Sequence, residues 1–279
     1  LDTEQGAVRL MQDTALDGYE NRHRISAKLE TVSTLRDNVK ELTFHTTNSA
    51  SSGGNGEQKT VRRSDSAGPA MGYRPGQFVL VKVSDSPYMY RAYSVSSTNP
   101  NDPERLSVTV LKKPGGFGSD IVFNEFSEGQ EIEVEGPMGH DLIVDKSSQN
   151  IVMVAGGIGI TPFVPIARDL VDDPGNIRKA TLVYGVNKES EFLYDEHFRR
   201  LSAESDIFDY VKAVAFPESE WTGHTGFVTS VLEQMDLRGS QVYMCGPPAM
   251  VNAVNTTFAR MRRAGNGVDT ASVHYETAS

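Results

Sequence analysis

Cysteine is nearly absent from this sequence. The 279 residues include only Cys245, which allows no disulfide within the chain and no iron–sulfur cluster of its own, because such clusters need several thiolates. A chain without disulfides is typical of a reducing compartment, so we expect a cytoplasmic protein. The six histidines are scattered without the spacing of metal ligands, and no metal site is predicted.

Positive charge and long apolar runs are also scarce. Lys and Arg number 27 against 37 Asp and Glu, which gives a formal net charge of −10. Such a balance argues against nucleic acid or an anionic membrane as a partner. The longest apolar run, Ile151 to Ala167, contains three glycines and two prolines and is short for a bilayer crossing, so no membrane span is expected.

The sequence divides into two parts with different patterns of apolar residues and turns. Up to about Val144, short strand-like runs are bounded by turns, which predicts an antiparallel β-barrel of about six strands. Beyond it, strands alternate with helices, which predicts a Rossmann-like parallel α/β sheet with right-handed crossovers. The expected parts are a polar extension over 1–22, a barrel domain over 23–146 with a Ser- and Gly-rich flexible loop over 48–72, and an α/β domain over 147–279.

Two motifs in the barrel part suit a flavin. Arg91-Ala92-Tyr93-Ser94 places on one strand a guanidinium for a phosphate, a flat ring for stacking and a hydroxyl for a hydrogen bond. The run Pro114 to Asp120 (PGGFGSD) contains three glycines, whose lack of side chains leaves the backbone amides accessible to an anion. Ser119 is expected to cap a helix there. An ordinary strand and a glycine-rich hairpin loop are the alternatives.

Two turns in the α/β part predict a nucleotide site. Gly156 to Pro162 (GGIGITP) follows a buried strand, with Thr161 expected as the helix cap and Pro162 as the first helical residue. It lacks the third glycine of the usual dinucleotide fingerprint. Cys245 to Pro248 (CGPP) lies beside it if the five expected strands are ordered 3-2-1-4-5, which leaves a space suited to a nicotinamide nucleotide.

Together with Tyr184-Gly185 and Met250, these motifs resemble the ferredoxin–NADP reductase superfamily. The resemblance is closer to the NADH-dependent flavin reductase components of bacterial oxygenases and to the reductase part of flavohaemoglobins, and it covers about His23 to Glu276. It implies a barrel that binds FAD and an α/β domain that binds the nicotinamide nucleotide. The implied reaction takes hydride from NADH onto FAD and passes electrons singly to a separate iron–sulfur or haem partner, such as a ferredoxin or an oxygenase.

The resemblance also implies roles for single residues. Arg91 would meet the flavin phosphate, Tyr93 would stack on the isoalloxazine, and Thr161 would lie between the two cofactors. The implied catalytic residues are Ser94, Cys245 and Glu276. The remaining implied contacts are Ala92, Val110, Gly116, Gly118 and Ser119 with the flavin, and Gly157, Pro162, Gly246 and Pro247 with the nicotinamide nucleotide.

The chain departs from the family pattern at two places. Leu111 stands where relatives often carry a lysine, so a lysine contact to the flavin is not expected. The C-terminal run Tyr275 to Ala278 keeps a glutamate but lacks the usual phenylalanine, so Glu276 is either a proton handler near the flavin or a solvated carboxylate.

Two further questions stay open in the sequence. NADH is favoured over NADPH, because Glu218 and Glu220 would repel a 2′-phosphate, although Lys188 could attract one. Alternatives to the partnered reductase are a free-flavin or quinone reductase that needs no protein acceptor, and a non-catalytic flavin-binding subunit.

Overall fold

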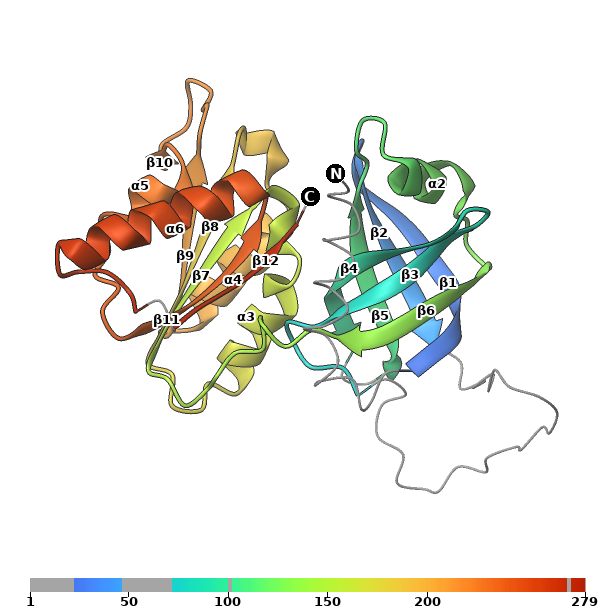
Figure 1. Ribbon diagram of the computed structural model, residues 1–279, viewed down its shortest axis with the longest axis horizontal. Helices are drawn as coiled ribbons and strands as arrows, with labels where there is room; N and C mark the ends of the chain where they lie inside the picture. Colours follow the sequence, from blue (N-terminus) through green and yellow to red (C-terminus); the bar gives the residue numbers. More distant parts are fainter. Residues whose placement is uncertain (1–22, 47–71, 100–101, 270–271, 279) are drawn as a thin grey trace, which may run out of the picture.

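The computed structural model describes residues 23–46, 72–99, 102–269 and 272–278. The expected extension over 1–22 and almost all of the expected loop over 48–72 lie outside these residues. The described chain forms two lobes side by side, a barrel and an α/β sheet (Figure 1). Within them, no helix has the length and apolar character needed to span a membrane.

The N-terminal lobe is a closed barrel of six antiparallel strands in the order β1-β2-β5-β4-β3-β6. This confirms the predicted fold of the first domain. Side chains alternate inward and outward, so that Val79, Val81 and Val83 of one strand all enter the barrel core. The helix α2 (Phe117–Glu125) adds Val122 to the same core. The strands are β1 (His23–Arg36), β2 (Val39–Thr46), β3 (Phe78–Asp85), β4 (Tyr88–Asn99), β5 (Asp102–Leu111) and β6 (Glu131–Met138).

The C-terminal lobe is a parallel sheet in the order β10-β9-β8-β7-β11-β12. Apart from β10 this is the predicted order 3-2-1-4-5, which is confirmed. The two-residue edge strand β10 was not predicted, because so short a segment carries no alternation. The strands are β7 (Asn150–Gly156), β8 (Lys179–Val186), β9 (Phe208–Val214), β10 (His224–Thr225), β11 (Ser240–Gly246) and β12 (Val273–Thr277).

Helices cover both faces of this sheet. One apolar core joins it to α3 (Phe163–Asp172) and α4 (Asp195–Glu204), and another joins it to α5 (Val228–Leu232) and α6 (Pro248–Arg263). The first core includes Val39 of the barrel, with Leu111 packed against it, so this face of the sheet meets the barrel. Two short 3-10 turns, η2 (Gly157–Ile160) and η3 (Glu189–Glu191), follow β7 and β8.

Candidate functional site

Arg91 of β4 lies against the first turn of α2. The approach depends on Gly118, since a Cβ on this residue would lie 3.1 Å from Nε of Arg91. The Arg91 side chain is exposed, and its Nη1 donates a hydrogen bond to the Tyr90 carbonyl at 2.9 Å. No carboxylate forms an ion pair with it in the described part of the chain. A guanidinium with free donors beside a helix N-terminus suits a phosphate group.

The glycine turn before α2 is closed by Ser119. Its Oγ accepts a hydrogen bond from the Lys113 amide at 3.1 Å and donates one to the Gly116 carbonyl at 2.9 Å. The helix begins at Phe117 after Gly116, with no side-chain cap, so the predicted Ser119 cap is wrong. A hydroxyl has one proton, which here is committed to the turn, so Ser119 supports the loop and leaves donation to the backbone amides.

The other flavin candidates differ in how accessible they are. Tyr93 is half-buried, and burial raises the pKa of its phenol to about 12, so it stays protonated. Ser94 is partly exposed and Ala92 is exposed. Val110 is only 1% exposed and belongs to the barrel core, so its side chain cannot reach a surface ligand and only its backbone could.

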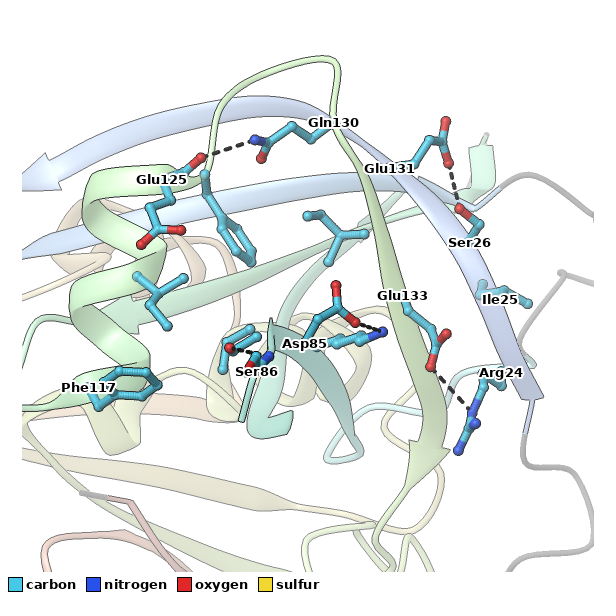
Figure 2. A pocket seen from close by; sticks show the side chains of 16 residues that line it. Arg24, Ile25, Ser26, Asp85, Ser86, Phe117, Glu125, Gln130, Glu131 and Glu133 are labelled. Atoms are coloured by element: carbon cyan, nitrogen blue, oxygen red, sulfur yellow. Dashed lines mark hydrogen bonds and ion pairs between the residues drawn. The ribbon is translucent and has the colours of Figure 1, made fainter. Parts of the chain in front are cut away.

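A cavity of about 660 Å³ opens on the barrel beside α2. Figure 2 shows Phe117 on one side of it and the ion pair of Arg24 with Glu133 on the other. Val83 links the cavity to Arg91, because Cγ2 of Val83 lies 3.5 Å from the Cβ position of Gly118. Sequence reasoning missed this cavity, since its lining comes from β1, β3, α2 and β6 together.

The two predicted nucleotide turns touch each other at the carboxyl ends of β7 and β11. A Cβ on Gly159 would lie 2.2 Å from the carbonyl oxygen of Cys245 and 2.7 Å from Cα of Gly246. Gly157 has φ +53° and open space where a side chain would be. The buried Tyr184 hydroxyl donates a hydrogen bond to the Gly157 carbonyl at 3.0 Å and accepts one from the Leu193 amide at 3.3 Å, which fixes the turn.

The helix after the first turn starts later than predicted. Pro162 takes the position before α3, without a side-chain cap, and Phe163 is the first helical residue. Thr161 ends the 3-10 turn and is 5% exposed, so the predicted Thr161 cap is wrong. The 3-10 turn over Gly157–Ile160 comes first, and the Thr161 amide closes it by donating to the Ile158 carbonyl at 3.2 Å. Of the second turn, Pro247 is exposed, whereas Gly246 is buried.

Cys245 and Glu276 are partners on neighbouring strands β11 and β12. Cys245 is 2% exposed, and burial together with the Glu276 charge raises the pKa of its thiol, so it is no thiolate nucleophile. Burial, with a smaller contribution from Asp141, raises the pKa of Glu276 from 4.5 to about 7. This carboxyl can therefore take up and release a proton near neutral pH.

A chain of contacts joins Glu276 to the flavin motif on the barrel. Ser94 lies opposite Phe78 in the register of β3 and β4. The Phe78 ring lies under Gly139, where a Cβ would be 2.9 Å from Cδ1 and Cε1. The same Cβ position is 3.3 Å from Oε1 of Glu276. The structure thus brings the barrel motif and the C-terminal strand together across the two domains.

Comparison with known proteins agrees with this division. Residues 60–141 match the family described as oxidoreductase FAD-binding domain, and residues 153–256 match the oxidoreductase NAD-binding domain. Within the described residues, the first match covers β3 to β6 of the barrel, and the second covers most of the α/β sheet.

Curated relatives include reductase components of oxygenases. The glycine betaine monooxygenase reductase subunit of Pseudomonas aeruginosa is 27% identical over 210 residues, which are 73% of this chain and 56% of that protein. The toluate 1,2-dioxygenase electron transfer component of Pseudomonas putida is 30% identical, over 74% of this chain and 59% of that protein. The electron transfer subunit of dihydroorotate dehydrogenase B (NAD(+)) from Shouchella clausii is 31% identical, over 68% and 69%. The chain thus spans about half the length of the first two relatives.

Solved structures share the fold. The Amycolatopsis cytochrome P450 reductase GcoB superposes with a TM-score of 0.73 at 24% identity, over 92% of this chain and 71% of that one. The flavohem-like FAD/NAD binding domain of nitric oxide dioxygenase from Vibrio cholerae gives 0.71 at 18% identity, over 91% and 98%. At these identities the likeness shows the fold alone.

Replacing Arg91 tests the phosphate assignment. We expect Arg91→Ala to weaken flavin binding by roughly 1.5–3 kcal/mol, the range for a hydrogen bond to a charged group. Titration of the flavin-free protein with flavin measures the change. Arg178→Ala, which removes an exposed arginine of the α/β domain, is the control and should bind flavin like the parent. Equal affinity of all three proteins would contradict the assignment.

Two glycine substitutions test the contact between the turns. Gly159→Ala drives a Cβ into the Cys245 backbone, so we expect the turns to separate, NADH binding to weaken about tenfold and unfolding to become easier by about 1–3 kcal/mol. Gly239→Ala is the matched control, because its Cβ also meets open space and adds only the strain of a positive φ (+70°), at the end of β11 opposite to the two turns. Nucleotide titration and thermal unfolding measure both. The contact has no such role if Gly159→Ala is the milder variant.

Proposed function

From the premise that this chain belongs to the FAD- and NAD-binding oxidoreductases of the ferredoxin–NADP reductase type, we propose that it takes hydride from NADH onto FAD and delivers electrons singly to a separate acceptor protein. One observation carries this proposal most strongly. The contacts from Ser94 through Phe78 and Gly139 to Glu276 bring the flavin motif to the sheet edge where the nucleotide turns lie. Hydride transfer needs the nicotinamide ring in contact with the isoalloxazine ring. Two binding motifs that meet at one edge of the sheet would allow this contact.

The residues on the barrel suit FAD. Arg91 and the amides of the glycine turn would hold the phosphates, and Tyr93 would offer its ring to the isoalloxazine. The cavity beside Phe117 adds room next to the phosphate position for the adenosine half, which a mononucleotide flavin lacks. Bound flavin supplies the chemistry, since it accepts a hydride and releases electrons one at a time.

The residues on the sheet suit a nicotinamide nucleotide. Gly157 and Pro247 would meet the nucleotide at the surface, while Cys245 packs beneath them and shapes the floor. Tyr184 keeps the Gly157 carbonyl turned toward the protein. Glu276 would hold or release the proton that accompanies the change in flavin charge.

Hydrogen bonds at the ends of β8 and β9 favour NADH over NADPH. The Glu218 amide donates to Oε1 of Glu189 at 2.9 Å, and the Asn187 amide donates to Oε2 of Glu191 at 3.0 Å. Carboxylates therefore occupy two amides that could otherwise bind a 2′-phosphate, and their charge would repel it. Lys188 is exposed and is the one cation at these turns.

The kind of relatives found suggests which protein accepts the electrons. Several are reductase or electron transfer components of oxygenases, which work with separate proteins. We therefore propose a ferredoxin, oxygenase or haem component as the acceptor. The cytoplasm is the proposed location, as predicted from the near absence of cysteine.

Rapid anaerobic mixing tests the reaction. The protein reconstituted with FAD should lose its flavin absorbance on mixing with NADH, and at least tenfold more slowly with equal NADPH, because the 2′-phosphate meets carboxylates. The reduced protein is then offered a panel of ferredoxins, haem proteins, free flavin and quinones. Faster reoxidation by free flavin or quinone than by any protein would favour the reductase without a protein partner. A protein that binds no flavin would point to a non-catalytic subunit.

Glu276→Gln tests the protonated carboxyl. Because the folded-state pKa lies above the unfolded value of about 4.5, Glu276 favours the folded state fully below that pH, and this contribution is lost as the pH rises through about 7. The parent should therefore lose thermal stability between pH 5 and pH 8 more steeply than Glu276→Gln. Glu204→Gln, an exposed control on α4, should follow the parent. Parallel curves for parent and Glu276→Gln would contradict the raised pKa.

A further inference from the structure

One tyrosine of the α/β domain reaches across the domain boundary into the barrel. Tyr194 lies just before α4, and its hydroxyl donates a hydrogen bond to Oε2 of Glu41 on β2 at 2.7 Å. The same hydroxyl is 2.5 Å from Oγ1 of Thr109 on β5. We propose that Tyr194 is a positioning residue, which fixes the orientation of the two domains and so the approach of nicotinamide to flavin. The inference rests on the proposed function.

Only one assignment of donors and acceptors is possible among Tyr194, Glu41 and Thr109. A carboxylate accepts only, so the Tyr194 proton goes to Glu41 and the Thr109 hydroxyl donates to the Tyr194 oxygen. Burial and the Glu41 charge raise the pKa of Tyr194, so the phenol remains a donor. Ser96 of β4 approaches the same Glu41 oxygen at 3.5 Å. Two barrel strands, β2 and β5, are thereby bonded directly to one side chain of the other domain, and β4 is linked to it through Glu41.

Two of these barrel groups, Thr109 and Ser96, are buried polar residues. Thr109 is 4% exposed and lies between Val108 and Val110, whose side chains fill the barrel core, so Thr109 itself faces outward. The fully buried Ser96 lies on β4, which packs against α3. Apolar packing at this boundary, such as that of Val39, is non-directional. Hydrogen bonds have preferred angles and can select one orientation.

The backbone at Tyr194 indicates that the side chain is needed. Its φ of 56° makes it the one residue other than glycine with a positive φ in the described ranges. Glycine or asparagine would adopt this conformation more easily. A tyrosine is kept in it only if its surroundings over-determine the position, and the contacts with Glu41 and Thr109 do so.

The same segment leads directly to the nucleotide turn. Leu193, the residue before Tyr194, donates its amide to the Tyr184 hydroxyl at 3.3 Å, and that hydroxyl donates to the Gly157 carbonyl at 3.0 Å. Hydrogen bonds on both sides of the Leu193–Tyr194 peptide thus connect the barrel to the turn proposed to hold the nicotinamide nucleotide. A shift at Tyr194 would move this turn relative to the flavin motif.

Tyr194→Phe removes the hydroxyl and keeps the ring. We expect the variant to retain flavin and its oxidised absorption spectrum, but to be reduced by saturating NADH about tenfold more slowly, because small misplacements are costly for hydride transfer. The long-wavelength absorbance of reduced flavin stacked on NAD⁺ should weaken. In the full chain without nucleotide, amide hydrogen exchange should accelerate in α3 and β5. Thr109→Val removes one of the two barrel partners and leaves Glu41, so it should give the same three changes to a smaller extent, without adding to those of Tyr194→Phe.

Tyr210→Phe is the matched control. Its hydroxyl donates to Oδ1 of Asp195 at 3.0 Å, within the α/β domain, so this variant should match the parent in all three measurements. Parent-like stacking absorbance and exchange in Tyr194→Phe would overturn the proposal, as would equal losses in Tyr210→Phe. If NADH fails to reduce even the parent, the proposed function is wrong, and the exchange comparison still decides whether Tyr194 holds the domains together.

Discussion

A backbone-to-backbone contact between two glycine turns determines the shape of the candidate nucleotide site. Strands β7 and β11 are parallel neighbours and end at the same edge of the sheet, so the loops that follow them pack against each other. Gly159 lies directly against the Cys245 carbonyl, at a distance that no Cβ could share. Because the loops pack backbone to backbone, the surface above them stays open at Gly157. A ligand can then approach main-chain groups that side chains would otherwise cover.

On the barrel, too, a glycine without a side chain allows a close contact at the candidate site. Gly118 allows Arg91 to lie along α2, and the Ser119 hydroxyl closes the preceding turn without a cap. Arg91 is thereby supported by packing and has no carboxylate partner among the described residues. One domain thus offers a cation beside the start of α2, and the other offers open backbone at Gly157. Each feature can serve the proposed hydride transfer only if the domains keep one orientation.

Much of this arrangement could be predicted from the sequence, because it follows local patterns. Alternating strands predicted the barrel, and the strand–helix alternation predicted the sheet order around Gly156 and Cys245. The helix caps were wrong at Ser119 and Thr161, since a hydroxyl near a helix start has several possible partners and its choice depends on turn geometry. The cavity beside Phe117 and the contacts of Tyr194 could not be predicted, because each needs several strands in known register.

Cys245 and Glu276 show how burial can give two neighbouring residues opposite properties. They are register partners on β11 and β12, and burial disfavours the charged form of both. For the thiol, whose ordinary pKa is already above neutral, burial only removes reactivity, and Cys245 becomes part of the packed floor. For the carboxyl, burial moves the pKa from 4.5 to about 7, into the range where a proton can move in either direction. The same environment therefore keeps the cysteine protonated and inert, and it makes the glutamate able to exchange a proton near neutral pH.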